Sequence, residues 1–255
     1  MRLKTFINEA RRNEVTYQFA QHYLEKYCSK ALKGQPIYRG VDDYTENYYT
    51  ITPSDFDERT SPYADHNYYN LLLSNLPSWS SYPKRNKSII CTTDINNAER
   101  RAHRKHPYYV IPTNSAKIAV CPANDIWYSF QSFSYNMNNF NSDLHEFLQQ
   151  GRVEIDDEFW DVNYKEFKIA CSDIDKIRDN GDLIYNDDYD IDYLRIYNKG
   201  KTKLIDFLSN LLDPKEHEFR LMAPDKYFGD DVEVWIGSEC LLIDVESEIG
   251  ITLFK

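Results

Sequence analysis

The chain has 255 residues, a length at which one domain can bury a substantial core. Its formal net charge is -11, which argues against a general nucleic-acid or membrane-surface binder, because both need a basic footprint. The five cysteines lie far apart without a CxxC pair, so we expect reduced thiols and no metal site. The start, Met1-Arg2-Leu3-Lys4, leads into polar residues, and no apolar run is long enough for a membrane span. We therefore expect a soluble protein of the cytoplasm.

The first quarter of the chain predicts a helix, a strand and a loop. Aromatic and aliphatic residues recur at three- to five-residue steps over residues 4–33, and Gly34 supplies the stop of a helix. Residues 36–41 read as a short strand that carries Arg39 near its middle. Residues 42–66 are polar and rich in turn formers, which predicts a surface loop.

The next segments predict two helices and three strands. A short helix over residues 68–76 is closed by Pro77. A strand over residues 88–93 ends in hydroxyls, and Asp94 is a plausible N-cap for the helix that follows it. This helix spans residues 95–106, and two short strands cover residues 108–111 and 117–121.

The basic stretch Lys84, Arg85 and Lys87 precedes the hydroxyl-ended strand. Three charges are too few to indicate a phosphate or nucleic-acid contact, so we interpret the stretch as solvated surface.

The remainder predicts a helical insertion followed by strands. Apolar residues at helical spacing fill about residues 123–215, and no Gly/Pro/Ser linker marks the edges of this stretch, so we expect a single domain over residues 1–255. Four C-terminal strands are expected over residues 218–222, 232–236, 240–244 and 250–254. Gly237-Ser238 is expected to form a tight turn after which strand 240–244 pairs with strand 232–236.

One of these strands contains acids inside an apolar run. Asp231 and Glu233 are two residues apart and would share one face of a strand, with Val232 and Val234 on the other. A carboxylate in such a run suits the wall of a cleft that receives a cationic or electron-poor ligand. The alternative is a half-exposed strand whose acids face water.

Three short motifs, in this order, resemble the Arg–Ser-Thr-Ser–Glu pattern of ADP-ribosyltransferases: Tyr38-Arg39-Gly40, then Cys91-Thr92-Thr93, then Glu233-Val234-Trp235-Ile236. They span nearly the whole chain. The resemblance implies an α+β fold with a split mixed or antiparallel β core around an NAD cleft, an N-terminal helix and a helical insertion. It also implies an intracellular effector of toxin or phage type. Such an effector would act in the cytoplasm, which includes the cytoplasm of a host cell.

The implied reaction breaks the bond between nicotinamide and ribose of NAD⁺ and transfers ADP-ribose to a macromolecule, with NAD⁺ as substrate. Glu233 would stabilise an oxocarbenium-like transition state, and Asp231 would orient the acceptor. Arg39 would hold the pyrophosphate. The resemblance assigns NAD binding to Arg39 together with Tyr38, Gly40, Cys91, Thr92 and Thr93.

Three residues depart from the family pattern. Cys91 and Thr93 replace serines, and the Cys91 thiol is the weaker hydrogen-bond partner. Asp231 replaces the first glutamate of Glu-x-Glu, so the acceptor stays open between protein side chains, which we favour, and nucleic acid. Glu239 precedes another apolar strand and offers a second register for the catalytic acid. The alternatives are a non-catalytic interaction or inhibitor protein on the same fold that binds a host protein complex, and a chance coincidence of three motifs on an unrelated fold.

Overall fold

The computed structural model describes residues 10–41, 46–53, 68–102, 106–130, 137–151, 163–183 and 192–254. The chain forms two compact units. The sheet unit comprises residues 1–59, 81–129 and 218–255, and the helical unit comprises residues 60–80 and 130–217. The helical unit thus takes residues from two separate stretches, of which the sequence singled out only the second.

Nine described strands form one sheet in which every pairing is antiparallel, with the order β1-β3-β9-β5-β2-β4-β8-β6-β7. The expected α+β class is therefore confirmed. The strands are β1 (Ala10–Glu14), β2 (Tyr38–Arg39), β3 (Tyr48–Pro53), β4 (Ile89–Thr92), β5 (Tyr108–Pro112), β6 (Ile118–Val120), β7 (Arg220–Met222), β8 (Glu233–Ile236) and β9 (Cys240–Asp244).

The shortest strand pairing in the sheet is the one between β2 and β4. These strands share a single residue pair, Tyr38 with Thr92, whereas each other neighbouring pair of strands shares two or more. The sheet is therefore close to divided at this point, with β1, β3, β9, β5 and β2 on one side and β4, β8, β6 and β7 on the other.

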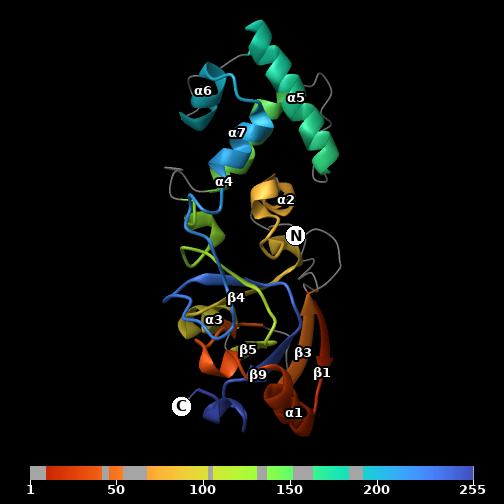
Figure 1. The fold of residues 1–255 in the computed structure, drawn as a ribbon, viewed down its shortest axis with the longest axis vertical. Coiled ribbons are helices and arrows are strands. Elements are labelled where there is room, and N and C mark those ends of the chain that lie inside the picture. The colour runs from red at the N-terminus through yellow and green to blue at the C-terminus, as the bar shows by residue number, and fades with distance from the viewer. Residues whose placement is uncertain are drawn as a thin grey trace, which may run out of the picture. The chain divides into compact units, whose positions relative to one another are not determined.

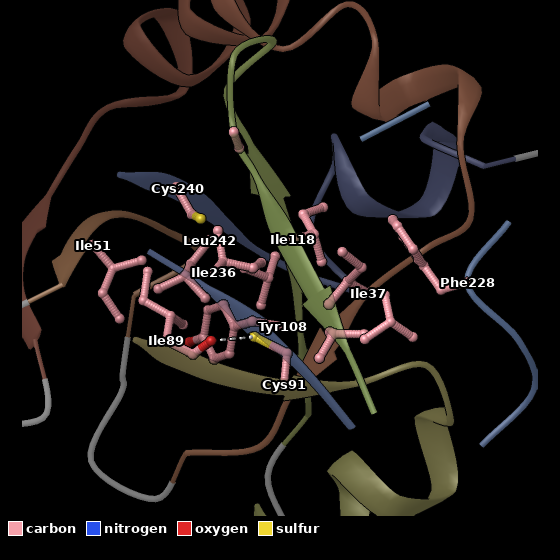
Figure 2. Close-up of a cluster of buried hydrophobic side chains, with 14 of the residues drawn as sticks. Ile37, Ile51, Ile89, Cys91, Tyr108, Ile118, Phe228, Ile236, Cys240 and Leu242 are labelled. Carbon is pink, nitrogen blue, oxygen red and sulfur yellow. Dashed lines mark hydrogen bonds between the residues drawn. The ribbon is translucent and has the colours of Figure 1, made fainter. Parts of the chain in front are cut away.

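An apolar cluster covers one face of the sheet, on both sides of this junction. Side chains alternate between the faces of a strand, so Cys91, Val234 and Leu242 enter the cluster while their strand neighbours point away from it. Figure 2 shows members of the cluster, among them Cys91 and Leu242, converging from strands far apart in the sequence, with Phe228 at the edge of the cluster.

Helix α1 (Tyr17–Tyr27) packs on the opposite face beside β3 and β9, as Figure 1 shows. It begins later than expected, because the hydroxyl of Thr16 accepts a hydrogen bond from the Phe19 amide and caps the helix there. Residues 10–14 form the edge strand β1 instead of helix, since pairing with β3 satisfies their backbone groups. Residues 4–9 of the predicted helix lie outside the described residues.

Three further expectations are wrong. Residues 48–53, expected in a loop, form β3, while the rest of that loop, apart from residues 46 and 47, is not described. Residues 250–252, expected in a strand, form a 3₁₀ turn, because Gly250 donates its amide to the Ser247 hydroxyl and reverses the chain. Strands β8 and β9 do not pair, because β4, β2 and β5 lie between them.

Helix α3 (Ile95–Arg101) packs against β2 and β4. Asp94 caps it as predicted, with its carboxylate accepting from the Asn96 amide at 3.0 Å. A Cβ atom on Gly40 would lie 2.0 Å from the carbonyl oxygen of Ala98, so only glycine permits this close packing.

The helical unit contains α2 (Tyr68–Asn75), α4 (Met137–Gln149), α5 (Tyr164–Asn180), α6 (Asp192–Lys199) and α7 (Leu204–Leu211). Asp175 links three of these helices, because its carboxylate accepts from the Tyr197 hydroxyl at 2.6 Å and from the Leu204 amide at 2.8 Å.

Short 3₁₀ helices cover Ala31–Lys33, Pro77–Trp79, Arg85–Lys87, Ile126–Tyr128 and Gly250–Thr252. In the part of the chain that is described, no helix has both the length and the apolar character that a membrane span requires.

Candidate functional site around Glu233

The three strands that carry the sequence motifs are hydrogen-bonded neighbours, in the order β2, β4, β8. Tyr38 pairs with Thr92, and Thr92 pairs with Glu233. Residues opposite one another across antiparallel strands project to the same face, so these three residues form one row across the sheet. We call it the Tyr38–Thr92–Glu233 row.

Glu233 is a buried, fully paired carboxylate. Only 2% of its surface is exposed, and Arg85, 7% exposed, lies against it. The Nε atom of Arg85 is 3.1 Å from Oε1 of Glu233, and Nη2 is 3.5 Å from Oε2. The indole N–H of Trp235 also donates to Oε1, at 2.5 Å. A buried charge needs an opposite charge and hydrogen bonds, and Glu233 has both.

Cys121 completes the surroundings of this carboxylate. Its sulfur lies 4.0 Å from Oε1 of Glu233, and its amide donates to the Glu233 carbonyl at 2.9 Å. Burial raises the pKa of the Cys121 thiol well above its usual range; the negative charge of Glu233 adds to this rise and Arg85 opposes it. The thiol is therefore protonated and can act as a weak donor to the carboxylate.

The three residues Cys91, Thr92 and Thr93 make contacts in different places. Figure 2 shows the Cys91 thiol inside the apolar cluster, where it donates to the Ile89 carbonyl at 3.7 Å. The hydroxyl of Thr92 accepts from the Asp94 amide at 3.1 Å. The hydroxyl of Thr93 donates to the Gly229 carbonyl at 2.9 Å and accepts from the Val232 amide at 3.0 Å. Of the three residues, only Thr92 belongs to the row with Glu233.

Arg39 lies one residue outside the row, so it does not share a face of the sheet with Glu233. Its Nη1 atom donates to the Ile90 carbonyl of β4 at 2.5 Å, beside the single β2–β4 pair. Arg39 pairs with Tyr108 of β5, whose side chain belongs to the apolar cluster, so Arg39 lies on the cluster side of the sheet. Arg39 thus adds a side-chain hydrogen bond to the short pairing between β2 and β4.

Tyr38 occupies the end of the row next to β5. Its ring lies 5.3 Å from that of Tyr109, centroid to centroid. Burial, with smaller effects of Tyr109 and Asp94, raises the pKa of Tyr38 to about 12. The hydroxyl therefore stays protonated at neutral pH.

Asp231 is placed differently from the expectation of a shared strand face. Strand β8 begins only at Glu233, and Asp231 has a left-handed backbone with φ of 48°. This conformation ends the extended run, so the alternation of faces does not apply. The exposed carboxylate of Asp231 accepts from Asn97 at 2.8 Å and from Asn124 at 3.0 Å.

Glu239, the second register, lies away from the row, in the link from β8 to β9. It is exposed and accepts hydrogen bonds from the Tyr23 hydroxyl at 2.5 Å and from the Thr52 hydroxyl at 3.4 Å. These contacts connect α1 and β3 to the β8–β9 link, and none of them involves a motif residue.

The sequence reasoning missed Arg85, since the interpretation of its stretch as solvated surface is wrong for this residue. Lys84 and Lys87 are exposed, whereas Arg85 is buried against Glu233. The available signal was indirect: an acid inside a buried strand requires a cation, but its identity depends on tertiary contacts.

No family model, curated protein or solved structure matches this chain. Among the described residues, no group of three or more His, Cys, Asp or Glu side chains is arranged to hold a metal ion.

Proposed function

We propose that the protein is an NAD⁺-dependent mono-ADP-ribosyltransferase, a glycosyltransferase that cleaves the nicotinamide–ribose bond of NAD⁺. It transfers ADP-ribose to a macromolecular acceptor, for which we favour a protein. The observation that supports this proposal is the adjacency of β2, β4 and β8. Their motifs lie at residues 38–40, 91–93 and 233–236. One residue of each motif, Tyr38, Thr92 and Glu233, lies in a single row of the sheet, as a common site requires, whereas Arg39 lies on the other face.

In the proposed reaction, Glu233 accepts a hydrogen bond from a ribose hydroxyl and stabilises the positive charge that develops at the anomeric carbon. The carbon–nitrogen bond breaks and its electron pair leaves with nicotinamide. A nucleophile of the acceptor, or water, then forms the new bond to that carbon and loses its proton. Asp231 is exposed and held by Asn97 and Asn124, a position from which it can orient the acceptor.

The proposal requires two rearrangements on binding NAD⁺. The carboxylate of Glu233 must become accessible from its buried position. The guanidinium of Arg39 must exchange the Ile90 carbonyl for the pyrophosphate, a partner for which a forked, permanently charged donor is well suited.

The second candidate is a non-catalytic interaction or inhibitor protein that binds a host protein complex. The paired and buried state of Glu233 favours it, because an ion pair of this kind needs no substrate. With a net charge of -11, such a protein would suit a basic partner surface.

Incubation with labelled NAD⁺, alone and with a cell lysate, tests the proposal. We expect release of nicotinamide and a labelled macromolecule, identified by mass spectrometry, with loss of both in Glu233→Gln and a raised KM in Arg39→Ala. Absence of release, of labelling and of calorimetric NAD⁺ binding, together with tight binding to a protein partner, would support the second candidate. An active Glu233→Gln beside an inactive Glu239→Gln would place the catalytic acid in the other register.

A further inference from the structure

We infer that Arg85 is a positioning residue for Glu233, which keeps this carboxylate charged and fixes its orientation within the Tyr38–Thr92–Glu233 row. The inference rests on the proposed function, since it assigns Arg85 a part in that reaction.

The contact between the two side chains is forked. Nε of Arg85 faces one carboxylate oxygen at 3.1 Å and Nη2 faces the other at 3.5 Å. A planar guanidinium that reaches both oxygens restricts rotation of the carboxylate plane, which a single donor would not do. Trp235 lies two residues further on β8 and therefore on the same face, and it donates to Oε1 at 2.5 Å.

Arg85 is itself held by its surroundings. It begins the 3₁₀ turn Arg85–Lys87, in which the Ser88 amide donates to the Arg85 carbonyl at 3.2 Å. The Ser88 hydroxyl donates to the Lys84 carbonyl at 2.7 Å and closes the same turn. The guanidinium carbon lies 5.8 Å from the centre of the Trp235 ring, within the range of a cation–π contact. Arg85 is thus held in place by its own turn and by the Trp235 ring.

This support matters for the chemistry because an unpaired carboxylate inside a protein tends to take up a proton. A neutral Glu233 could not stabilise a developing positive charge. Arg85 contacts Glu233 and Trp235 and is almost fully buried, so its loss should affect the chemical step more than the affinity for NAD⁺.

The test compares Arg85→Gln, Arg85→Lys and the control Lys87→Gln in steady-state nicotinamide release from NAD⁺. Lys87 is exposed and lies in the same 3₁₀ turn. Residues that orient the ligands of metal sites typically contribute about 10- to 100-fold to activity, and we expect an effect of the same size from a residue that orients a carboxylate. We expect a loss of this size in kcat for Arg85→Gln, an intermediate loss for Arg85→Lys, which keeps the charge without the fork, and no change for Lys87→Gln. KM should stay within a small factor of the wild-type value in all three.

Circular dichroism establishes which variants are folded. Should Arg85→Gln fail to fold, the folded Arg85→Lys decides, because it leaves no uncompensated charge. Wild-type kcat in Arg85→Lys, or in a folded Arg85→Gln, would overturn the inference and leave the proposed function standing. A loss confined to KM would also overturn it. A wild-type protein that releases no nicotinamide would overturn both the inference about Arg85 and the proposed function.

Discussion

At the scale of single residues, the acid inside an apolar strand is explained by its partners. Glu233 tolerates 2% exposure because Arg85, Trp235 and Cys121 donate to it. The sequence revealed the unusual acid but not the cation, which is 148 positions away along the chain. No local pattern distinguishes Arg85 from its exposed neighbours Lys84 and Lys87, because only the tertiary fold buries one and exposes the others.

The Arg85–Glu233 pair should behave as an energetic unit. Removing one partner of a buried ion pair leaves the other uncompensated and typically costs about 3–5 kcal/mol. We expect Arg85→Met to lower the free energy of unfolding by this amount, and the double variant Arg85→Met/Glu233→Gln to recover part of it. Urea unfolding of the wild type, Arg85→Met, Glu233→Gln and the double variant measures the coupling. Strictly additive losses would show that the two side chains do not stabilise each other.

The buried thiols should make the protein less stable at alkaline pH. Burial raises the pKa of Cys28 to about 12, and it raises the pKa values of Cys121 and Cys240 well above their usual range. An unfolded thiol has a pKa of about 8.5, so the unfolded state loses these protons first. The stabilisation is complete below that pH and is lost as the pH rises toward the folded-state values.

Urea unfolding at several pH values from about 7.5 to 10, with reductant present, checks this expectation. The free energy of unfolding should fall across the range, and Cys28→Ala should make the fall shallower. A stability that is constant or rises with pH would contradict it.

At the scale of elements, local patterns were sufficient where the signal is local. The strand character of β4 and β8 and the Asp94 cap of α3 follow from neighbouring residues. Local patterns did not predict the structure where pairing with a distant segment determines it. The polar residues 10–14 form strand β1 because they pair with β3. Strand β8 does not pair with β9, although a short link joins the two strands. The resemblance implies a ligand-binding role for Gly40, and the structure adds a packing constraint at this residue that no local pattern indicates.

Gly40→Ala should separate α3 from β2. Its new Cβ atom would lie 2.0 Å from the Ala98 carbonyl and 2.7 Å from the Ala102 amide, and both are backbone atoms that cannot swing aside. Overpacking of this kind typically costs about 1–3 kcal/mol. Gly200→Ala is the control, since its Cβ atom would come no closer than 3.4 Å to any neighbour. Equal midpoints of thermal unfolding for the two variants would argue against the packing role of Gly40.

Thr16→Ala should weaken the start of α1. The hydroxyl of Thr16 accepts from the Phe19 amide at 3.2 Å, and loss of such a cap typically costs about 1 kcal/mol. Thr16→Ser keeps the acceptor and should retain most of the stability. Chemical denaturation that finds Thr16→Ala as stable as Thr16→Ser would show that the cap does not set this helix start.

At the scale of the whole molecule, the α+β class could be predicted from the mixture of helical and strand periodicities. The strand order could not, because it depends on which distant segments pair. That order makes β2, β4 and β8 neighbours and brings Tyr38, Thr92 and Glu233 into one row. Arg39 lies on the other face of the sheet, so the role that the resemblance implies for it needs a rearrangement that no local pattern indicates.

The most direct measurement of the central claim is nicotinamide release from NAD⁺ by the wild type, Glu233→Gln and Glu239→Gln under identical conditions. The proposal predicts release by the wild type and by Glu239→Gln, and loss of about 10²-fold or more in Glu233→Gln, the size typical for removing one group that stabilises transition-state charge. Equal release by the wild type and Glu233→Gln, or no release by the wild type, would contradict it.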